Sequence, residues 1–130
     1  MDKQAGQKEY VTLRLKLARK KLRVAQLLFK NREYRDVVSR AYYSIFYATK
    51  AFLLKHGQDP SSHKGVDTLF HRFCATHNKP SVDFAKILSL MRHARLDADY
   101  RENARITKED AQEAIDMAQS FLKEIQALTK

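Results

Sequence analysis

The 130-residue sequence is poor in cysteine, glycine and proline, with one, three and two of them. The single cysteine, Cys74, cannot form an internal disulfide, which fits a reducing cytosol. The three glycines stand far apart, so the chain has no glycine-rich phosphate-binding loop. One cysteine and scattered histidines provide no pattern for a structural zinc ion. We therefore expect neither a metal nor a cofactor.

Other signals are missing as well. No apolar run is long enough to span a membrane, and the N-terminus lacks the apolar core of a signal peptide. No serine-nucleophile elbow and no internal repeat is present. Cys74 falls on an apolar face beside Phe70 and Phe73, which favours a small core residue over a nucleophile. These features predict one cytoplasmic domain over residues 1–130, without membrane association.

What the sequence does contain is helical periodicity in five segments. The segment Val37–Leu54 is apolar on nearly every side, which is typical of a helix in the centre of a bundle. The expected helices cover about residues 8–31, 34–55, 63–76, 82 to 102–104, and 108–128, with the residues up to about Gln7 frayed. Ser61 or Ser62, Ser81 and Thr107 are the expected N-caps. Short loops between one-sided apolar stripes predict an all-α antiparallel bundle of four to five helices.

Positive charge is concentrated at the start of the chain. The net charge is +10. Residues 1–32 hold ten Lys and Arg against two acids, or +8, and the rest hold fifteen against thirteen, or +2. A basic first helix indicates an acidic protein partner or a nucleic-acid phosphate track. A solvated Lys/Arg face explains the same charge equally well.

Three ionisable residues, Arg40, Arg95 and Asp99, stand at positions where the helical period expects apolar side chains. A buried arginine needs a carboxylate or several other acceptors. We therefore expect an ionic network between the second and fourth helices, in which Asp99 pairs with one or both arginines. Tyr42, Tyr43 and Tyr100 can complete it through their hydroxyls. The network is either a structural device or a site for a phosphate or a base.

His63 is a second candidate. It is expected in the first turn of the third helix, where the helix dipole disfavours the charged imidazole. A neutral imidazole is available for acid–base chemistry. The alternative is an exposed or capping histidine.

The segments 39–46 (SRAYYSIF), 62–65 (SHKG) and 95–100 (RLDADY), followed by a helix opened at 106–107, resemble the HEPN domain family. The resemblance covers about residues 18–128 and is closest to small stand-alone bacterial and archaeal members. It implies a compact bundle of four to five helices that forms a homodimer. It also implies a minimal nucleotidyltransferase as partner in a toxin–antitoxin-type pair.

The resemblance leaves three functions open. The first is a partner-bound protein that binds nucleotide or RNA through Arg40, Tyr43, Arg95, Asp99 and Tyr100, unless these form a polar core network. The second is a metal-independent RNase, since many HEPN proteins cleave RNA with an Arg-x(4–6)-His motif. Arg72 with His77 is the match here, and His63 with Arg40 or Arg95 is a second possible set. The third is a protein-interaction bundle without its own ligand.

Overall fold

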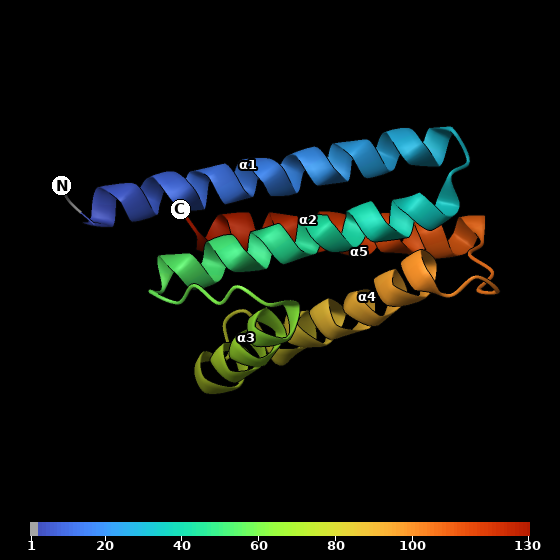
Figure 1. Cartoon of the computed structure of the whole chain (residues 1–130). Helices are drawn as coiled ribbons and strands as arrows, with labels where there is room; N and C mark the ends of the chain where they lie inside the picture. The colour runs from blue at the N-terminus through green and yellow to red at the C-terminus, as the bar shows by residue number, and fades with distance from the viewer. Residues whose placement is uncertain (1–2) are drawn as a thin grey trace.

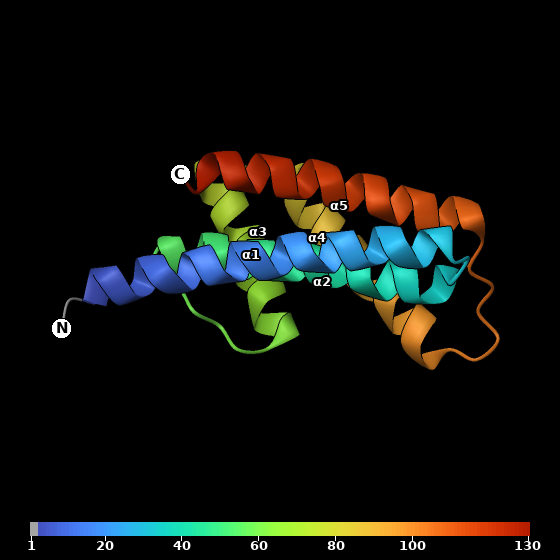
Figure 2. The ribbon, with the colours of Figure 1, turned by 90° about the horizontal axis from the view of Figure 1, so that it is seen from above.

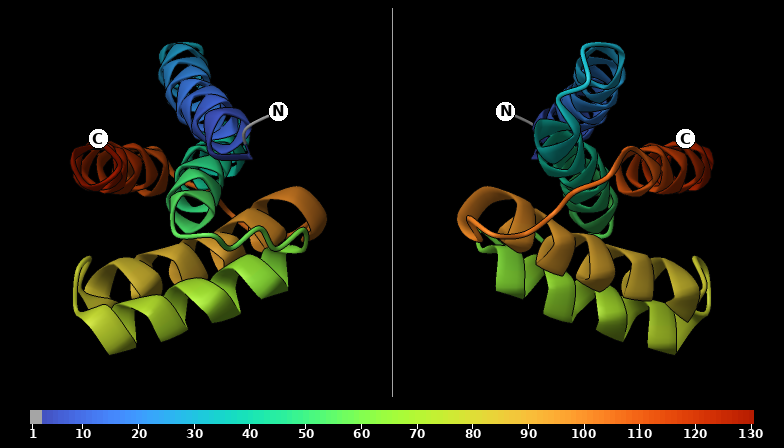
Figure 3. Two further views of the ribbon diagram at one scale, coloured as in Figure 1. Left: turned by 90° about the vertical axis from the view of Figure 1, so that its left-hand side faces the viewer. Right: turned by 90° about the vertical axis from the view of Figure 1, so that its right-hand side faces the viewer.

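The computed structural model describes residues 3–130, and within them five α-helices and no strands. The helices are α1 (Lys3–Lys30), α2 (Tyr34–Lys55), α3 (His63–His77), α4 (Val82–Tyr100) and α5 (Lys108–Leu128). Figure 1 shows α1 and α2 lying antiparallel along one another, with α5 beside them. In the end-on views of Figure 3, α3 and α4 run obliquely across α2. The all-α bundle predicted from the sequence is confirmed.

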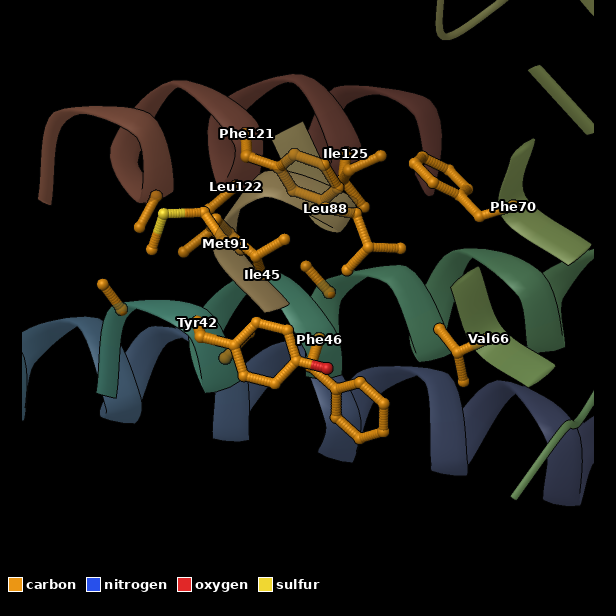
Figure 4. Packing of buried hydrophobic residues seen from close by; sticks show 14 of the residues in the cluster. Tyr42, Ile45, Phe46, Val66, Phe70, Leu88, Met91, Phe121, Leu122 and Ile125 are labelled. Atoms are coloured by element: carbon orange, nitrogen blue, oxygen red, sulfur yellow. The ribbon is translucent and has the colours of Figure 1, made fainter. Parts of the chain in front are cut away.

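The helix α2 is the centre of the fold, because it contacts each of the other four helices. Its side chains are buried on most sides, from Val37 to Leu53, as its apolar composition predicts. Figure 4 shows the core that forms around it, in which Tyr42, Ile45 and Phe46 face residues from three other helices. These residues are Val66 and Phe70 of α3, Leu88 and Met91 of α4, and Phe121, Leu122 and Ile125 of α5.

Cys74 belongs to this core and is buried. Burial raises the pKa of its thiol to about 11, so the thiol stays protonated near neutral pH. A protonated, enclosed thiol is a poor nucleophile. Cys74 is therefore a small core residue, as its position on an apolar face predicts.

The helix ends follow local sequence signals with two differences. Ser62 accepts a hydrogen bond from the backbone of Gly65, and Thr107 forms a reciprocal capping box with Asp110. Ser81 occupies the N-cap of α4 without a side-chain cap bond. The helix α4 ends at Tyr100, before the predicted 102–104.

The other difference concerns the start of α1, which begins at Lys3 where the sequence predicted about Lys8. The expectation of a frayed start up to Gln7 falls partly on residues 1–2, which lie outside the described range; from Lys3 onward the backbone is helical. None of the helices in residues 3–130 combines the length and the apolar composition that crossing a membrane requires.

Candidate functional site

Arg95 of α4 lies against three tyrosine rings. Its guanidinium carbon is 5.4 Å from the centre of the Tyr42 ring, 5.5 Å from that of Tyr43 and 5.9 Å from that of Tyr100. Such distances allow cation–π attraction. We call Arg95, these three tyrosines and His63 the Arg95 cluster. The cluster draws on three helices. Tyr42 and Tyr43 come from α2, Arg95 and Tyr100 from the last turns of α4, and His63 is the first residue of α3.

Arg95 is largely buried, with 8% of its surface exposed, whereas Tyr100 beside it is 72% exposed. Nη1 of Arg95 lies 3.4 Å from Oδ2 of Asp99, one helical turn away, so the two form an ion pair. Asp99 also accepts a hydrogen bond from Ser39 of α2 at 3.4 Å. The Nε group of Arg95 is buried and has no hydrogen-bond partner among the described residues. The Nε–H group of the guanidinium is therefore an unused donor.

His63 reaches the cluster because the loop before α3 closes tightly. The Ser62 cap fixes the first turn of α3. A Cβ atom on Gly65 would lie 2.9 Å from Oγ of Ser62 and 3.3 Å from Cβ of Pro60, so only glycine lets the loop approach this closely. The imidazole of His63 then stacks on the Phe46 ring with 4.3 Å between ring centres.

The imidazole of His63 is neutral near pH 7. Its pKa is lowered, first by burial and then by the positive charges of Arg95 and Arg92. Burial also raises the pKa of Tyr42, whose hydroxyl therefore keeps its proton. That hydroxyl lies 2.6 Å from Nδ1 of His63, and the two form a hydrogen bond whose donor depends on the imidazole tautomer. The sequence predicted a neutral His63 from the helix dipole, and in the structure burial is the largest of the causes that lower its pKa.

Arg40 lies apart from this arrangement. It is exposed and forms no ion pair with a residue in 3–130, so the expectation that it is buried is wrong, and of the two arginines Arg95 alone pairs with Asp99. The reason is that α2 keeps one exposed side despite its apolar composition. Asp36, Arg40, Tyr43, Tyr47 and Lys50 recur there at steps of four and three, and none of them is fully buried.

The structure does not bring Arg72 and His77 together. Both are exposed on α3, and five residues of helix turn side chains about 140° apart. The ring of His77 packs on Phe73, with 4.2 Å between ring centres. No contact is recorded between this pair and the Arg95 cluster within residues 3–130.

A polar group that the sequence analysis did not identify ties α3 to α4 nearby. The buried carboxylate of Asp67 accepts a hydrogen bond from Oγ of Ser89 at 2.7 Å and lies 3.3 Å from Nε of Arg92. Nε2 of His71 lies 2.8 Å from Oγ of Ser89 and 3.1 Å from Oδ1 of Asp67. The one available signal was the four-residue spacing of Asp67 and His71 on a helix.

This group contains serine, histidine and aspartate but is not a nucleophilic triad. In a triad, the histidine uses one ring nitrogen for serine and the other for aspartate. Here Nε2 of His71 faces both, and the Ser89 hydroxyl already donates to Asp67. We interpret the group as a clamp that holds α3, and with it His63, in place against α4.

The family model described as HEPN domain matches residues 11–128, which include every residue of the Arg95 cluster. The chain belongs to the HEPN domain family. The resemblance noted from the SRAYYSIF, SHKG and RLDADY segments is therefore confirmed. The Arg95 cluster thus lies within the part of the chain that matches the HEPN domain.

Similar HEPN relatives come from archaea and bacteria. The chain is 32% identical over 123 residues to "Putative toxin MJ0605" of Methanocaldococcus jannaschii, covering 95% of this chain and 91% of that protein. It is 34% identical over 111 residues to a UPF0332 protein of Thermotoga maritima, covering 85% and 84%. A second M. jannaschii protein, "Putative toxin MJ0142", is 32% identical over 105 residues, covering 81% and 71%. This HEPN chain is thus related to proteins named as putative toxins.

Proposed function

We propose that this HEPN protein is a component of a toxin–antitoxin-type pair, acts with a minimal nucleotidyltransferase, and binds nucleotide or RNA at the Arg95 cluster. Family membership and the names of two relatives support the first part. The ligand is supported by the packing of Arg95 among tyrosine rings, one of which is exposed. This packing is the main observation that supports binding of nucleotide or RNA at the cluster.

The chemistry of the cluster suits a nucleotide, which offers a base and a phosphate together. The exposed ring of Tyr100 provides a surface on which a base can stack. The guanidinium of Arg95 suits a phosphate, and its present partner Asp99 keeps 27% of its side chain exposed. In the proposed complex, a phosphate replaces Asp99 beside the guanidinium while the base rests on Tyr100.

Binding of fluorescently labelled ATP and of a short single-stranded RNA, measured by anisotropy, tests this proposal. We expect Tyr100→Ala to weaken binding about tenfold, because stacking contributes about 1–3 kcal/mol per base. Tyr10→Ala is the matched control, since Tyr10 is a similarly exposed tyrosine on α1. The ligand proposal fails if neither probe binds, or if the two variants bind alike.

The partner is tested separately by co-expressing the full chain with the nucleotidyltransferase encoded nearest to its gene. Co-purification at stoichiometric yield in moderate salt supports the pairing. A nucleotidyltransferase that elutes apart from the chain at every ionic strength overturns it. This result does not depend on whether the Arg95 cluster binds a nucleotide.

A metal-independent RNase is the second candidate, and the neutral His63 beside Arg95 favours it. In the tautomer whose Nδ1–H donates to the Tyr42 hydroxyl, the neutral imidazole takes the proton of the attacking 2′-hydroxyl at Nε2 and then returns it to the leaving 5′-oxygen, while Arg95 stabilises phosphate charge. Cleavage of RNA in EDTA that is lost in His63→Ala and kept in His77→Ala supports this site. The opposite pattern assigns cleavage to Arg72 and His77. Loss of cleavage in both variants supports an RNase without choosing between the two sets, and cleavage that neither change affects rules out both.

A further inference from the structure

A row of apolar side chains lies along the outer side of α1. Tyr10, Leu13, Leu17 and Leu27 are 60%, 48%, 39% and 53% exposed. With Lys20 and the partly exposed Val24, they recur at steps of three, four, three, four and three. We call these six residues the outer stripe. The opposite side of α1 buries Val11, Ala18 and Ala25 against the bundle.

The spacing of the outer stripe is that of the a and d positions of a coiled coil. In Figures 1 and 3, α1 forms one margin of the bundle, so a helix has room to lie along its outer side. The helix has 28 residues and is therefore about 42 Å long. Four exposed large apolar side chains along one side of a helix mark an interaction surface, because leaving them in water is unfavourable. Its geometry fits another helix.

The charges beside the outer stripe select the kind of helix. Lys16, Arg23 and Lys30 follow one edge at intervals of seven, and Arg14 and Lys21 follow the other. Between residues 3 and 32, Glu9 is the one acidic residue. Arg14 pairs with Asp59 at 2.9 Å. The three exposed cations of the first edge form no ion pair with another residue in 3–130.

A second copy of this chain does not fit the outer stripe. Edge positions of paired helices face one another, in parallel and antiparallel pairs alike. Two copies would place Lys and Arg against Lys and Arg, which costs free energy. RNA would use the cations but leave the apolar row exposed. An acidic amphipathic helix buries the apolar row and neutralises the cations beside it. Its apolar seam covers the leucines, and its carboxylates lie against the basic residues of both edges.

We infer that the outer stripe of α1 docks an amphipathic helix of a protein partner, with Asp and Glu flanking its apolar seam. Lys20 within the stripe sets the register by pairing with an acidic residue of the partner seam. The inference deepens the proposed pairing with a partner protein and rests on that part of the proposed function. It does not involve the Arg95 cluster.

The test uses two synthetic helices of about four heptads, both with leucine at the seam positions. One carries Glu at every edge position and the other carries Lys. Titrated against the full chain at low salt, the Glu peptide should bind at least tenfold more tightly than the Lys peptide. Equal affinity for the two peptides, or no binding of the Glu peptide, overturns the inference.

A matched pair of double variants locates the binding face. Leu13→Gln with Leu17→Gln removes the centre of the outer stripe, and we expect at least tenfold weaker binding of the Glu peptide. Leu90→Gln with Leu96→Gln removes two leucines of α4 with similar exposure, 55% and 39%, and should leave binding unchanged. Thermal unfolding checks that both variants fold. Equal effects of the two double variants overturn the assignment to α1.

Other occupants give different results with the same variants. If sedimentation shows self-association that only the outer-stripe variant abolishes, the face joins two copies and the inference is wrong. Loss of RNA binding, or of binding to vesicles with anionic lipid, in that variant alone also overturns it. If the nucleotidyltransferase co-purifies equally with both double variants, it is the partner of this chain but does not dock on the outer stripe, and the inference is wrong. If the Glu peptide binds the outer stripe but no nucleotidyltransferase co-purifies, the outer stripe is a docking face for an acidic helix, and the proposed nucleotidyltransferase partner is wrong.

Discussion

The hydroxyl of Tyr42 lies 2.6 Å from Nδ1 of His63 and joins the middle of α2 to the first residue of α3. The ring of the same tyrosine packs against the guanidinium of Arg95, so the side chain of Tyr42 contacts both Arg95 and His63. Figure 4 shows Tyr42 next to Phe46, on which His63 stacks. The central helix thus positions residues from two others.

Tyr42→Phe keeps the ring and removes the hydroxyl. We expect a loss of about 1 kcal/mol in the free energy of unfolding, because Nδ1 of His63 loses its hydrogen-bond partner. In the tautomer in which the hydroxyl donates to Nδ1, the hydrogen bond stabilises the neutral imidazole, so its loss should raise the pKa of His63. Chemical denaturation and an NMR titration of His63 measure the two effects. Tyr47→Phe is the control, and an equal loss in both variants would contradict the role of this bond.

The pH dependence of stability follows from His63 as well. Its pKa is lowered in the folded protein from 6.5, so the unfolded chain binds the proton more readily. The free energy of unfolding should therefore rise with pH up to about 6.5 and be fully recovered above it. His56, whose pKa is also lowered, acts in the same direction.

Replacing His63 with glutamine should flatten part of this rise, because a non-titrating residue carries no proton linkage. Urea denaturation at a series of pH values provides the measurement. His93→Gln, at an exposed histidine of α4, is the matched control. An unchanged slope in the His63 variant would show that His63 is not the group that titrates.

Asp67→Asn tests the clamp between α3 and α4. The change removes the negative charge that faces Arg92 at 3.3 Å and leaves a partly buried cation without its partner. We expect a loss of about 2 kcal/mol. The exposed pair of Asp97 and Arg101, 3.9 Å apart, serves as control, and Asp97→Asn should change stability little. Similar losses in both variants would contradict a structural role for the clamp.

Gly65→Ala tests the closure of the loop over α3. The added methyl group meets Oγ of Ser62 and Cβ of Pro60, so we expect loss of the cap and about 1 kcal/mol of stability. Gly6→Ala meets nothing within 4 Å in α1 and should stabilise the protein by about 0.5 kcal/mol. Thermal unfolding compares them, and a Gly65 variant as stable as the parent would exclude the tight approach.

The helices and their caps were predictable because they depend on neighbours in the chain. The period of apolar residues fixed the number of helices, and Thr107 with Asp110 fixed the start of α5 through bonds only three residues apart. The central place of α2 followed from its composition. Arg95 and Asp99 paired as their four-residue spacing indicates.

The rest depended on packing between helices. The side of α2 that remains exposed depends on how the other helices cover it, and this placed Arg40 in solvent although Val38, Ala41 and Tyr42 are buried. The carboxylate of Asp67 found its partners 22 and 25 residues away on α4.

Sequence alone therefore determined five helices, a basic α1 and the family to which the chain belongs. The tertiary structure decided that His63 meets Tyr42 and Arg95, because contacts between distant segments depend on how whole helix faces fit together. It also decided which side of α1 stays uncovered, because only the packed bundle shows which apolar residues other helices bury.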